Sequence, residues 1–340
     1  MGSRPTIYDV ARAAGVSKSL VSLVLNGSDL VSEPRRRAVL AAMESLGYRP
    51  SRAATTLAAA RSHVVGVLID DYRNPWFVEL LHGLREALVP HGYHLTVADL
   101  LTSGGSPMDA LEGFLGEHVD ALVVAAELGR DHDDLGVPTV VVGNREHAVS
   151  NADRVTSDER AGVRLLLQHL VAHGHRRIGH VTGVGGSARW RLDAYCEVLG
   201  ELGEDVRWAG STYDTNEEGG YRGTVELLAR HPEVTAVFAA NDTMALGARA
   251  ALREASREVP ADVALVGYDD SLLAKARYLD LTTVDSRNAD VGRAAGGALL
   301  RRLSEPAAAA TNVVIEPRLV VRSSSVHPPP ERAAVSSRRP

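Results

Sequence analysis

Cysteine is nearly absent from the 340-residue chain, and long apolar runs are missing altogether. A single cysteine, Cys196, excludes a disulfide framework or a cysteine-ligated metal centre within one chain, and we expect it to be a small buried apolar side chain. No stretch of about eighteen uninterrupted apolar residues occurs, so no membrane span is predicted. The segment from Met1 to Asp9 lacks the long apolar run of a secretory signal, which favours a cytoplasmic protein.

Motifs of the common enzyme classes are missing as well. The chain has no Gly-x-x-x-x-Gly-Lys-Ser/Thr phosphate loop and no His-Glu-x-x-His pair. The run Gly183-Val-Gly-Gly-Ser187 follows a predicted strand but lacks the spacing of a dinucleotide-binding loop. Four histidines cluster between His169 and His180, where we expect surface and turn positions at the end of a helix. The sequence therefore predicts no cofactor, no metal site and no enzymatic activity.

Charge is distributed unevenly along the chain. The first 61 residues carry a net charge of +5, and the remainder carries −11, within a total of −6. A basic head on an acidic body suits a protein whose head faces phosphate, although a solvated charged face gives a similar count. The length of 340 residues suits two or three domains.

The head has the pattern of three short helices. Thr6 followed by Asp9 predicts a capping box at the start of the first helix. Gly15 supplies a tight turn, and Ser17 is a suitable N-cap for a second helix that Asn26-Gly27 ends. A third helix is predicted from the cap Ser32 to Gly47.

The body alternates apolar strand patterns with helical ones, which predicts parallel, doubly wound sheets. The predicted helices include residues 75–91, 159–173, 217–230 and 243–257. The predicted strands cover residues 64–69, 95–98, 121–125, 139–142, 178–182, 236–240, 264–267 and 281–284. These strands and helices are too many for a single sheet, so we expect two lobes. The predicted organisation is a head at 1–49, a hinge or linker at 50–61, a two-lobed body at 62–322 and a disordered Ser-, Pro- and Arg-rich tail at 323–340.

The strongest motif lies in the head, from Tyr8 to Asn26, where two helices flank a glycine turn as in a helix-turn-helix. It resembles the lactose-repressor family of bacterial regulators, whose head reads Asp-Val-Ala, Ala-Gly-Val-Ser, Val-Ser and Asn. The matching residues are Asp9-Val10-Ala11, Ala14-Gly15-Val16-Ser17, Val21-Ser22 and Asn26. A three-helix bundle that only packs is the alternative.

The resemblance implies DNA binding by the head. Its DNA-facing candidates are Thr6, Ser17, Lys18, Ser19, Ser22 and Asn26. Lys18 is the best of them for a base or phosphate contact, because a cation there can donate to guanine O6 or N7. Leu20 stands where the family often has Thr, and Leu23 where it often has a polar residue. These apolar side chains could contact a thymine methyl group or simply pack, so the operator sequence stays open.

The segment from Tyr48 to Leu57 resembles the family's hinge, in which a short helix from each subunit enters the minor groove. The resemblance implies that Leu57 wedges between bases, with Ala54 as the small neighbour and Arg52 as a further contact. Ser51 replaces the usual Asn after Pro50 and can still cap a helix. An ordinary flexible linker with a buried leucine is the alternative.

The body resembles the family to about Arg322. The shared landmarks are Asn74-Pro-Trp-Phe77, Gly174-His-Arg-Arg-Ile178, Arg189-Trp-Arg191, Ala240-Asn-Asp-Thr-Met-Ala-Leu-Gly247 and Val266-Gly-Tyr-Asp-Asp270. The resemblance implies an effector cleft between two lobes like those of periplasmic sugar-binding proteins. The effector-binding candidates it implies are Asp70, Trp76, Phe77, Arg145, Ser187, Arg191, Tyr213, Asn241 and Asp269.

Several of these effector-binding candidates have a structural alternative. Arg191 could form an internal ion pair, and Trp76 and Phe77 could pack only against the body. One residue of Asn241-Asp242 is expected to cap the following helix. Gly143 stands where the family often has an acidic residue, so whether Asn144 or Arg145 faces the ligand stays open.

The chemistry of the candidates suits a polyhydroxylated ligand, a sugar or sugar derivative. The chain is thus interpreted as a ligand-responsive regulator, a repressor in most of the family, that binds a near-palindromic double-stranded operator as a homodimer. No leucine heptads follow Ser323, which favours a dimer over a tail-assembled tetramer. The alternatives are a solute-binding protein that shares the body fold, and an α/β enzyme with an accessory head.

Overall fold

The structure is a computed structural model that describes residues 5–25, 28, 30–48, 61–103 and 106–326. The predictions for Asn26, Arg52, Ala54 and Leu57 lie outside the described residues. The same holds for the predicted hinge, of which only Arg61 is described, and for the tail from residue 327.

The head folds as three helices, α1 (Ile7–Ala14), α2 (Lys18–Leu25) and α3 (Glu33–Leu46). The predicted capping box is present, because Thr6 Oγ accepts from the Asp9 amide while the Asp9 carboxylate accepts from the Thr6 amide. Gly15 ends α1 with a φ of 65°, a left-handed conformation that glycine adopts without strain. The buried core of the head consists of Val10, Ala11, Val21, Val24, Val31, Val39 and Ala42.

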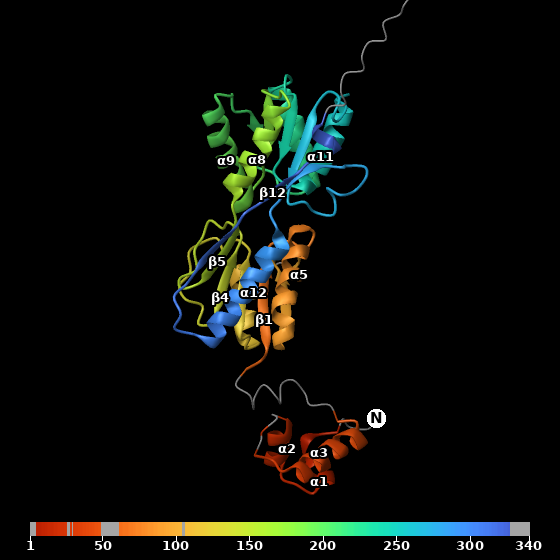
Figure 1. The fold of residues 1–340 in the computed structure, drawn as a ribbon, viewed down its shortest axis with the longest axis vertical. Coiled ribbons are helices and arrows are strands. Elements are labelled where there is room, and N and C mark those ends of the chain that lie inside the picture. Colours follow the sequence, from red (N-terminus) through yellow and green to blue (C-terminus); the bar gives the residue numbers. More distant parts are fainter. Residues whose placement is uncertain (1–4, 26–27, 29, 49–60, 104–105, 327–340) are drawn as a thin grey trace, which may run out of the picture.

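The body consists of two α/β lobes, each built on a six-stranded sheet (Figure 1). In lobe 1 the strand order is β11-β5-β4-β3-β1-β2, and every pairing is parallel. Its strands are β1 (Val64–Ile69), β2 (His94–Asp99), β3 (Ala121–Ala125), β4 (Thr139–Val142), β5 (Asp153–Ser157) and β11 (Asn312–Ile315). Its helices are α5 (Trp76–Leu88), η1 (Val89–His91), α6 (Leu100–Ser103), α7 (Pro107–Gly116) and α12 (Asn288–Ser304).

Lobe 2 has the strand order β12-β10-β9-β8-β6-β7, parallel except for the antiparallel pair of β10 and β12. Its strands are β6 (Ile178–Val181), β7 (Trp208–Ala209), β8 (Ala236–Ala239), β9 (Ala264–Tyr268), β10 (Thr282–Asp285) and β12 (Arg318–Val320). Its helices are α8 (Glu159–Ala172), α9 (Gly186–Leu202), α10 (Glu217–Arg230), α11 (Asp242–Glu254) and η2 (Ser323–Ser325).

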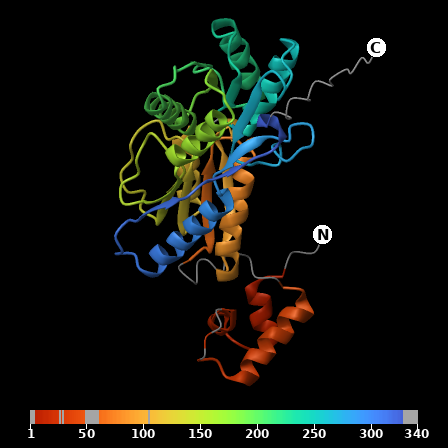
Figure 2. The same cartoon turned by 45° about the horizontal axis from the view of Figure 1, so that its top comes forward.

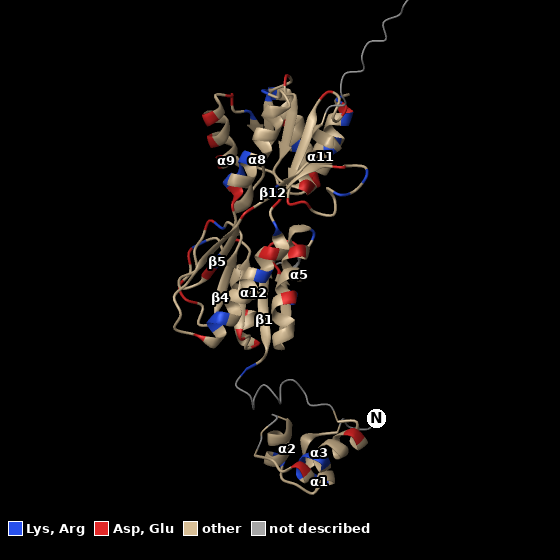
Figure 3. Ribbon diagram, viewed as in Figure 1, with Lys and Arg blue, Asp and Glu red and all other residues tan. Residues whose placement is uncertain are grey.

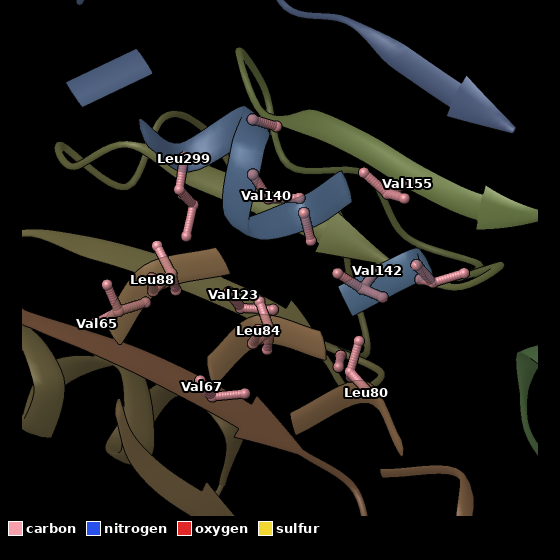
Figure 4. Close-up of a cluster of buried hydrophobic side chains, with 14 of the residues drawn as sticks. Val65, Val67, Leu80, Leu84, Leu88, Val123, Val140, Val142, Val155 and Leu299 are labelled. Carbon is pink, nitrogen blue, oxygen red and sulfur yellow. The ribbon is translucent and has the colours of Figure 1, made fainter. Parts of the chain in front are cut away.

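Each sheet is covered on both faces, which is why its central strands β1, β3, β8 and β9 are apolar almost throughout. In lobe 1, α5 and α12 lie side by side on one face (Figures 1 and 2). Their leucines and valines pack onto β1, β3, β4 and β5 in a fully buried cluster, in which Leu84 and Leu299 face the strand valines (Figure 4). In lobe 2, α8 and α9 cover one face and α10 and α11 the other.

Within the described part of the body, the chain crosses between the lobes three times. The crossings follow β5 at Asp158, β10 at Ser286-Arg287 and β11 at Glu316-Pro317. Two of them are tied together, since the Asp158 amide donates to Ile315 O at 3.1 Å. The crossings leave the carboxyl ends of the parallel strands of both lobes facing each other, which is where ligands bind in open α/β sheets.

The structure confirms the predicted fold class and corrects the boundary of the tail. Ser323–Ser325 forms the short 3-10 helix η2 instead of the start of a disordered segment, and both Ser324 and Ser325 are buried. Ser324 Oγ donates to Leu265 O at 2.6 Å and accepts from the Thr282 amide at 2.8 Å. The Ser324 hydroxyl thus satisfies one backbone group of β9 and one of β10, so the body continues beyond residue 322.

Candidate functional site

A cavity of about 300 Å³ lies between the two lobes. Lobe 1 contributes residues that follow β1, β3 and β4 and the first turn of α5, and lobe 2 contributes residues that follow β6, β8 and β9 and the loop before α10. Acidic and basic residues both occur where the lobes meet (Figure 3). The lining side chains with polar or aromatic chemistry are Asp70, Asp71, Arg73, Asn74, Trp76, Phe77, Glu127, Arg145, Ser187, Arg191, Asp214, Thr215, Asn216, Asn241 and Asp269.

On the lobe 1 side, Asp70 and Arg145 form the centre of the wall. Arg145 Nη1 donates to Asp70 Oδ2 at 3.1 Å, while its other nitrogens donate to Val142 O at 3.0 Å and Ala125 O at 2.8 Å. Asp70 Oδ1 also accepts from the Glu127 amide at 3.0 Å. The ends of β1, β3 and β4 are thereby fastened together, and the guanidinium of Arg145 is fixed before any ligand arrives.

The aromatic part of the lobe 1 wall comes from the start of α5. Trp76 and Phe77 meet edge to face, with their ring centroids 4.9 Å apart. Phe77 is 3% exposed and belongs to the core of lobe 1, whereas Trp76 is half-buried and lies 5.9 Å from the guanidinium of Arg145. Trp76 therefore has exposed ring surface that a ligand can contact, whereas Phe77 chiefly packs against it.

On the lobe 2 side, Arg191 of α9 is buried in an ionic cluster. It donates to both carboxylate oxygens of Glu159 at 2.8 and 3.2 Å, to Asp269 Oδ1 at 3.1 Å and to Ala240 O at 2.6 Å. Burial alone would lower the pKa of Arg191, but the charges of Glu159 and Asp269 raise it overall. Burial raises the pKa of Asp269 to about 7 in spite of the nearby arginine. The internal ion pair considered as an alternative for Arg191 is therefore present, although the side chain also lines the cavity.

Asn241 and Asp242, at the start of α11, have different roles. Asn241 is the N-cap, since its Oδ1 accepts from the Met244 amide at 2.7 Å, and its Nδ2 donates to Thr215 O at 3.0 Å. Asp242 lies behind the cavity wall and accepts from Thr283 Oγ1 at 2.6 Å and from the Ser271 amide at 2.7 Å. Burial raises the pKa of Asp242 to about 6.

The structure brings eight of the nine effector-binding candidates to the cavity. The exception is Tyr213, which is not among the lining residues, because its ring lies toward Gly223 of α10 while its neighbours Asp214 and Thr215 form the wall. The structure also shows which of Asn144 and Arg145 faces the cavity. Asn144 Nδ2 donates to Ser157 O at 3.3 Å and is absent from the lining, whereas Arg145 is part of it.

Sequence reasoning missed Glu127 and Glu159. Glu127 comes directly after the apolar run of β3, so the rule that ligands meet the carboxyl ends of parallel strands could have identified it. Glu159 begins α8, far in sequence from its partner Arg191, and only the folded lobe brings the two together.

In the head, the predicted DNA-binding residues Ser17, Lys18 and Ser19 lie at the start of α2, Ser22 lies farther along this helix, and Thr6 precedes α1. Ser17, Lys18 and Ser19 are exposed, and Ser22 is half-buried. Ser17 Oγ accepts from the Leu20 amide at 3.2 Å, and Lys18 Nζ lies 5.1 Å from the centroid of the Tyr8 ring. Thr6 is exposed but occupied as the cap of α1. Of the two departures from the family pattern, Leu20 is half-buried against the core, whereas Leu23 is 41% exposed.

Comparison with known proteins matches both parts of the chain. Residues 6–51 match the family model of bacterial regulatory proteins of the lacI family, and residues 167–325 match that of a periplasmic binding protein-like domain. The transcriptional regulator CelR of Thermobifida fusca is 36% identical over 326 residues, covering 88% of this chain and 92% of CelR. The chain belongs to the LacI family of bacterial transcriptional regulators.

Solved structures of LacI-family proteins agree with the fold. The lac repressor dimer bound to operator and the anti-inducer ONPF has a TM-score of 0.81 at 28% identity, with 96% of this chain and 100% of that chain covered. A complex of the regulator CelR with cellobiose has a TM-score of 0.67 at 32% identity, with 94% and 100% covered. The chain is thus a DNA-binding transcriptional regulator with an effector-binding body. Among its described residues, no helix is both long and apolar enough to cross a membrane.

Proposed function

We propose that the protein is a repressor without catalytic activity, whose operator affinity is set by a neutral polyhydroxylated ligand in the cavity between the lobes. The ligand class is a sugar or sugar derivative. The observation that carries this proposal is the charge balance of the cavity, which has five lining carboxylates against three arginines.

The arginines have little capacity left for an anionic ligand. Arg145 and Arg191 are bound by internal carboxylates and carbonyls, and Arg73 pairs with Asp71 at 3.0 Å. A phosphate or carboxylate group would therefore meet surplus negative charge, which disfavours it. Hydroxyl groups can donate to carboxylates and accept from amide nitrogens, and the half-buried Trp76 offers an apolar face.

Relatives support both halves of the proposal. CelR has been solved with cellobiose, and the lac repressor with its operator. We propose by the same likeness that this chain binds a near-palindromic operator as a homodimer, with Ser17, Lys18, Ser19, Ser22 and Asn26 at the major groove and Arg52, Ala54 and Leu57 at the minor groove.

The lobes supply the switch. A ligand held by Asp70 and Trp76 of lobe 1 and by Ser187 and Asp269 of lobe 2 binds one arrangement of the lobes better than another. A change in the arrangement of the lobes alters the spacing of the two heads in a dimer. The difference in ligand affinity between the two arrangements sets how far DNA affinity can change.

A thermal-shift screen tests the ligand class. Neutral mono- and disaccharides are compared with the corresponding sugar phosphates and uronic acids at equal concentration. We expect stabilisation by at least one neutral sugar and none by its phosphate. Stabilisation by the anionic forms alone would refute the proposal.

The variant Asp214→Asn removes one lining carboxylate and should weaken the response to the sugar. Asp193→Asn is the matched control, because Asp193 is an exposed residue of α9 outside the lining and should leave the response unchanged.

A further inference from the structure

The chain enters lobe 1 from the head through residues 61–63, and these residues are fastened to the base of the lobe. Asp120, just before β3, holds two of them with one carboxylate. Its Oδ1 accepts from the Ser62 amide at 2.7 Å and from Ser62 Oγ at 2.9 Å, and its Oδ2 accepts from the His63 amide at 3.0 Å. Three hydrogen bonds to one charged group make an anchor stronger than a neutral turn would provide.

The third residue, Arg61, reaches a different element. Its Nη2 donates to Leu303 O at 3.2 Å, in the last turn of α12. Carbonyls in the last turn of a helix have no partner within the helix, and a cation there is favoured by the helix dipole. Arg61 is itself exposed, so this contact directs the chain without contributing to a core.

Helix α12 connects this contact to the cavity. At its first residue, Asn288 Nδ2 lies 3.5 Å from the carbonyl oxygen of Asp269, a cavity residue. At its other end lies Leu303. The 17 residues of α12 span roughly 25 Å, and Figure 1 shows the helix running from the junction of the lobes toward the end of lobe 1 where β1 begins.

We propose that Asp120, with the carboxyl end of α12, forms a linker clamp that fixes where the tether of the DNA-binding head leaves the body. The clamp consists of Arg61, Ser62, His63, Asp120 and Leu303. Asp120 is its positioning residue. The inference rests on DNA binding by a dimer and is independent of the ligand class proposed above.

The clamp affects how readily the second head of a dimer binds its half-site of the operator. Once one head of a dimer is bound, the other binds at an effective concentration set by how freely its tether moves. A clamped exit point restricts each head to the volume near its half-site. Release of residues 61–63 enlarges that volume but leaves the contact of each head with DNA unchanged.

The test compares two DNA ligands with the full-length protein. One is the palindromic operator obtained by selection, and the other contains a single half-site. Asp120→Asn keeps one acceptor oxygen but places its amide NH2 against the backbone donor of either Ser62 or His63, so one side of the anchor is lost. We expect it to lower affinity for the palindrome by on the order of tenfold while affinity for the half-site stays unchanged.

Asp280→Asn is the matched control. Asp280 Oδ2 likewise accepts from a serine amide, that of Ser323, at 3.2 Å, but it lies in lobe 2. It should match the wild type on both DNA ligands. The thermal midpoints of both variants show whether a loss of affinity merely follows a loss of stability.

Two further variants keep the proposal falsifiable if Asp120→Asn does not fold. Arg61→Ala alters only an exposed side chain, and Ser62→Ala removes one donor. Each should reduce affinity for the palindrome but not for the half-site. If Asp120→Asn does fold, adding Ser62→Ala to it should lower the affinity by less than the sum of the two single effects. Equal losses on the palindrome and the half-site, or wild-type affinity in the variants that fold, would overturn the clamp.

Discussion

Replacing Asp269 by asparagine should change how the stability of the protein depends on pH. Asp269 is 7% exposed, and burial raises its pKa from 3.8 to about 7. A carboxyl group whose folded pKa is raised contributes stability that is fully present below about pH 3.8 and is lost as the pH rises through about 7. The variant Asp269→Asn cannot ionise and should not show this loss.

The expected magnitude follows from the shift in pKa. One unit corresponds to about 1.4 kcal/mol, so ionisation of Asp269 should reduce the free energy of unfolding of the wild type by about 3 kcal/mol between about pH 5 and pH 8. Asp242, whose pKa is raised to about 6, is present in both proteins, and its charge contributes to the raised pKa of Asp269, so the comparison measures Asp269 together with its coupling to Asp242.

The assay is urea unfolding at several pH values between those limits, followed by tryptophan fluorescence and circular dichroism. Two of the three tryptophans, Trp190 and Trp208, lie in lobe 2 with Asp269. The difference in unfolding free energy between Asp269→Asn and the wild type should grow in favour of the variant as the pH rises. A difference that stays constant would show that Asp269 is ionised throughout, and the reasoning about its burial would fail.

Other substitutions test other parts of the molecule. Arg191→Met leaves two buried carboxylates without their cation, so unfolding at pH 7 should require about 3–5 kcal/mol less free energy. Gly186→Ala adds a Cβ that collides with Glu127 Oε1 and with the backbone carbonyl oxygen of Asn144 across the cleft, so the lobes must shift apart and calorimetric titration should show weaker sugar binding. Leu57→Ala should weaken binding to the selected operator by about 1–3 kcal/mol in a gel-shift titration, and leave sugar binding intact.

Interactions between residues close in sequence determine much of the structure of the head. The capping box of Thr6 and Asp9 and the left-handed turn at Gly15 depend on neighbours within three or four residues, and both were predicted. Most strands of the body were predicted from their apolar runs. β5 was missed because Asp153, Arg154 and Ser157 interrupt its pattern, and the short strands β7, β11 and β12 were missed as well.

Tertiary contacts explain what the sequence could not predict. Asp153 is fully buried in a strand because Arg301 and Arg302 of α12 donate to it at 2.7 Å each, across some 150 residues of chain. Arg191 is a second example. The resemblance to the family indicated that it lies at the cavity, but not that its guanidinium donates to both carboxylate oxygens of Glu159. Tyr213 shows the opposite limit, because the resemblance implied a role at the cavity, whereas its ring lies toward Gly223 and outside the lining.

A titration of the palindromic operator against the full-length protein, with and without the sugar that stabilises it, tests the central claim most directly. We expect the sugar to change the dissociation constant for the operator by at least about tenfold, the scale of a typical coupling free energy between two sites. Sugar that binds in the cavity and leaves operator affinity unchanged would contradict the claim that this cavity controls DNA binding.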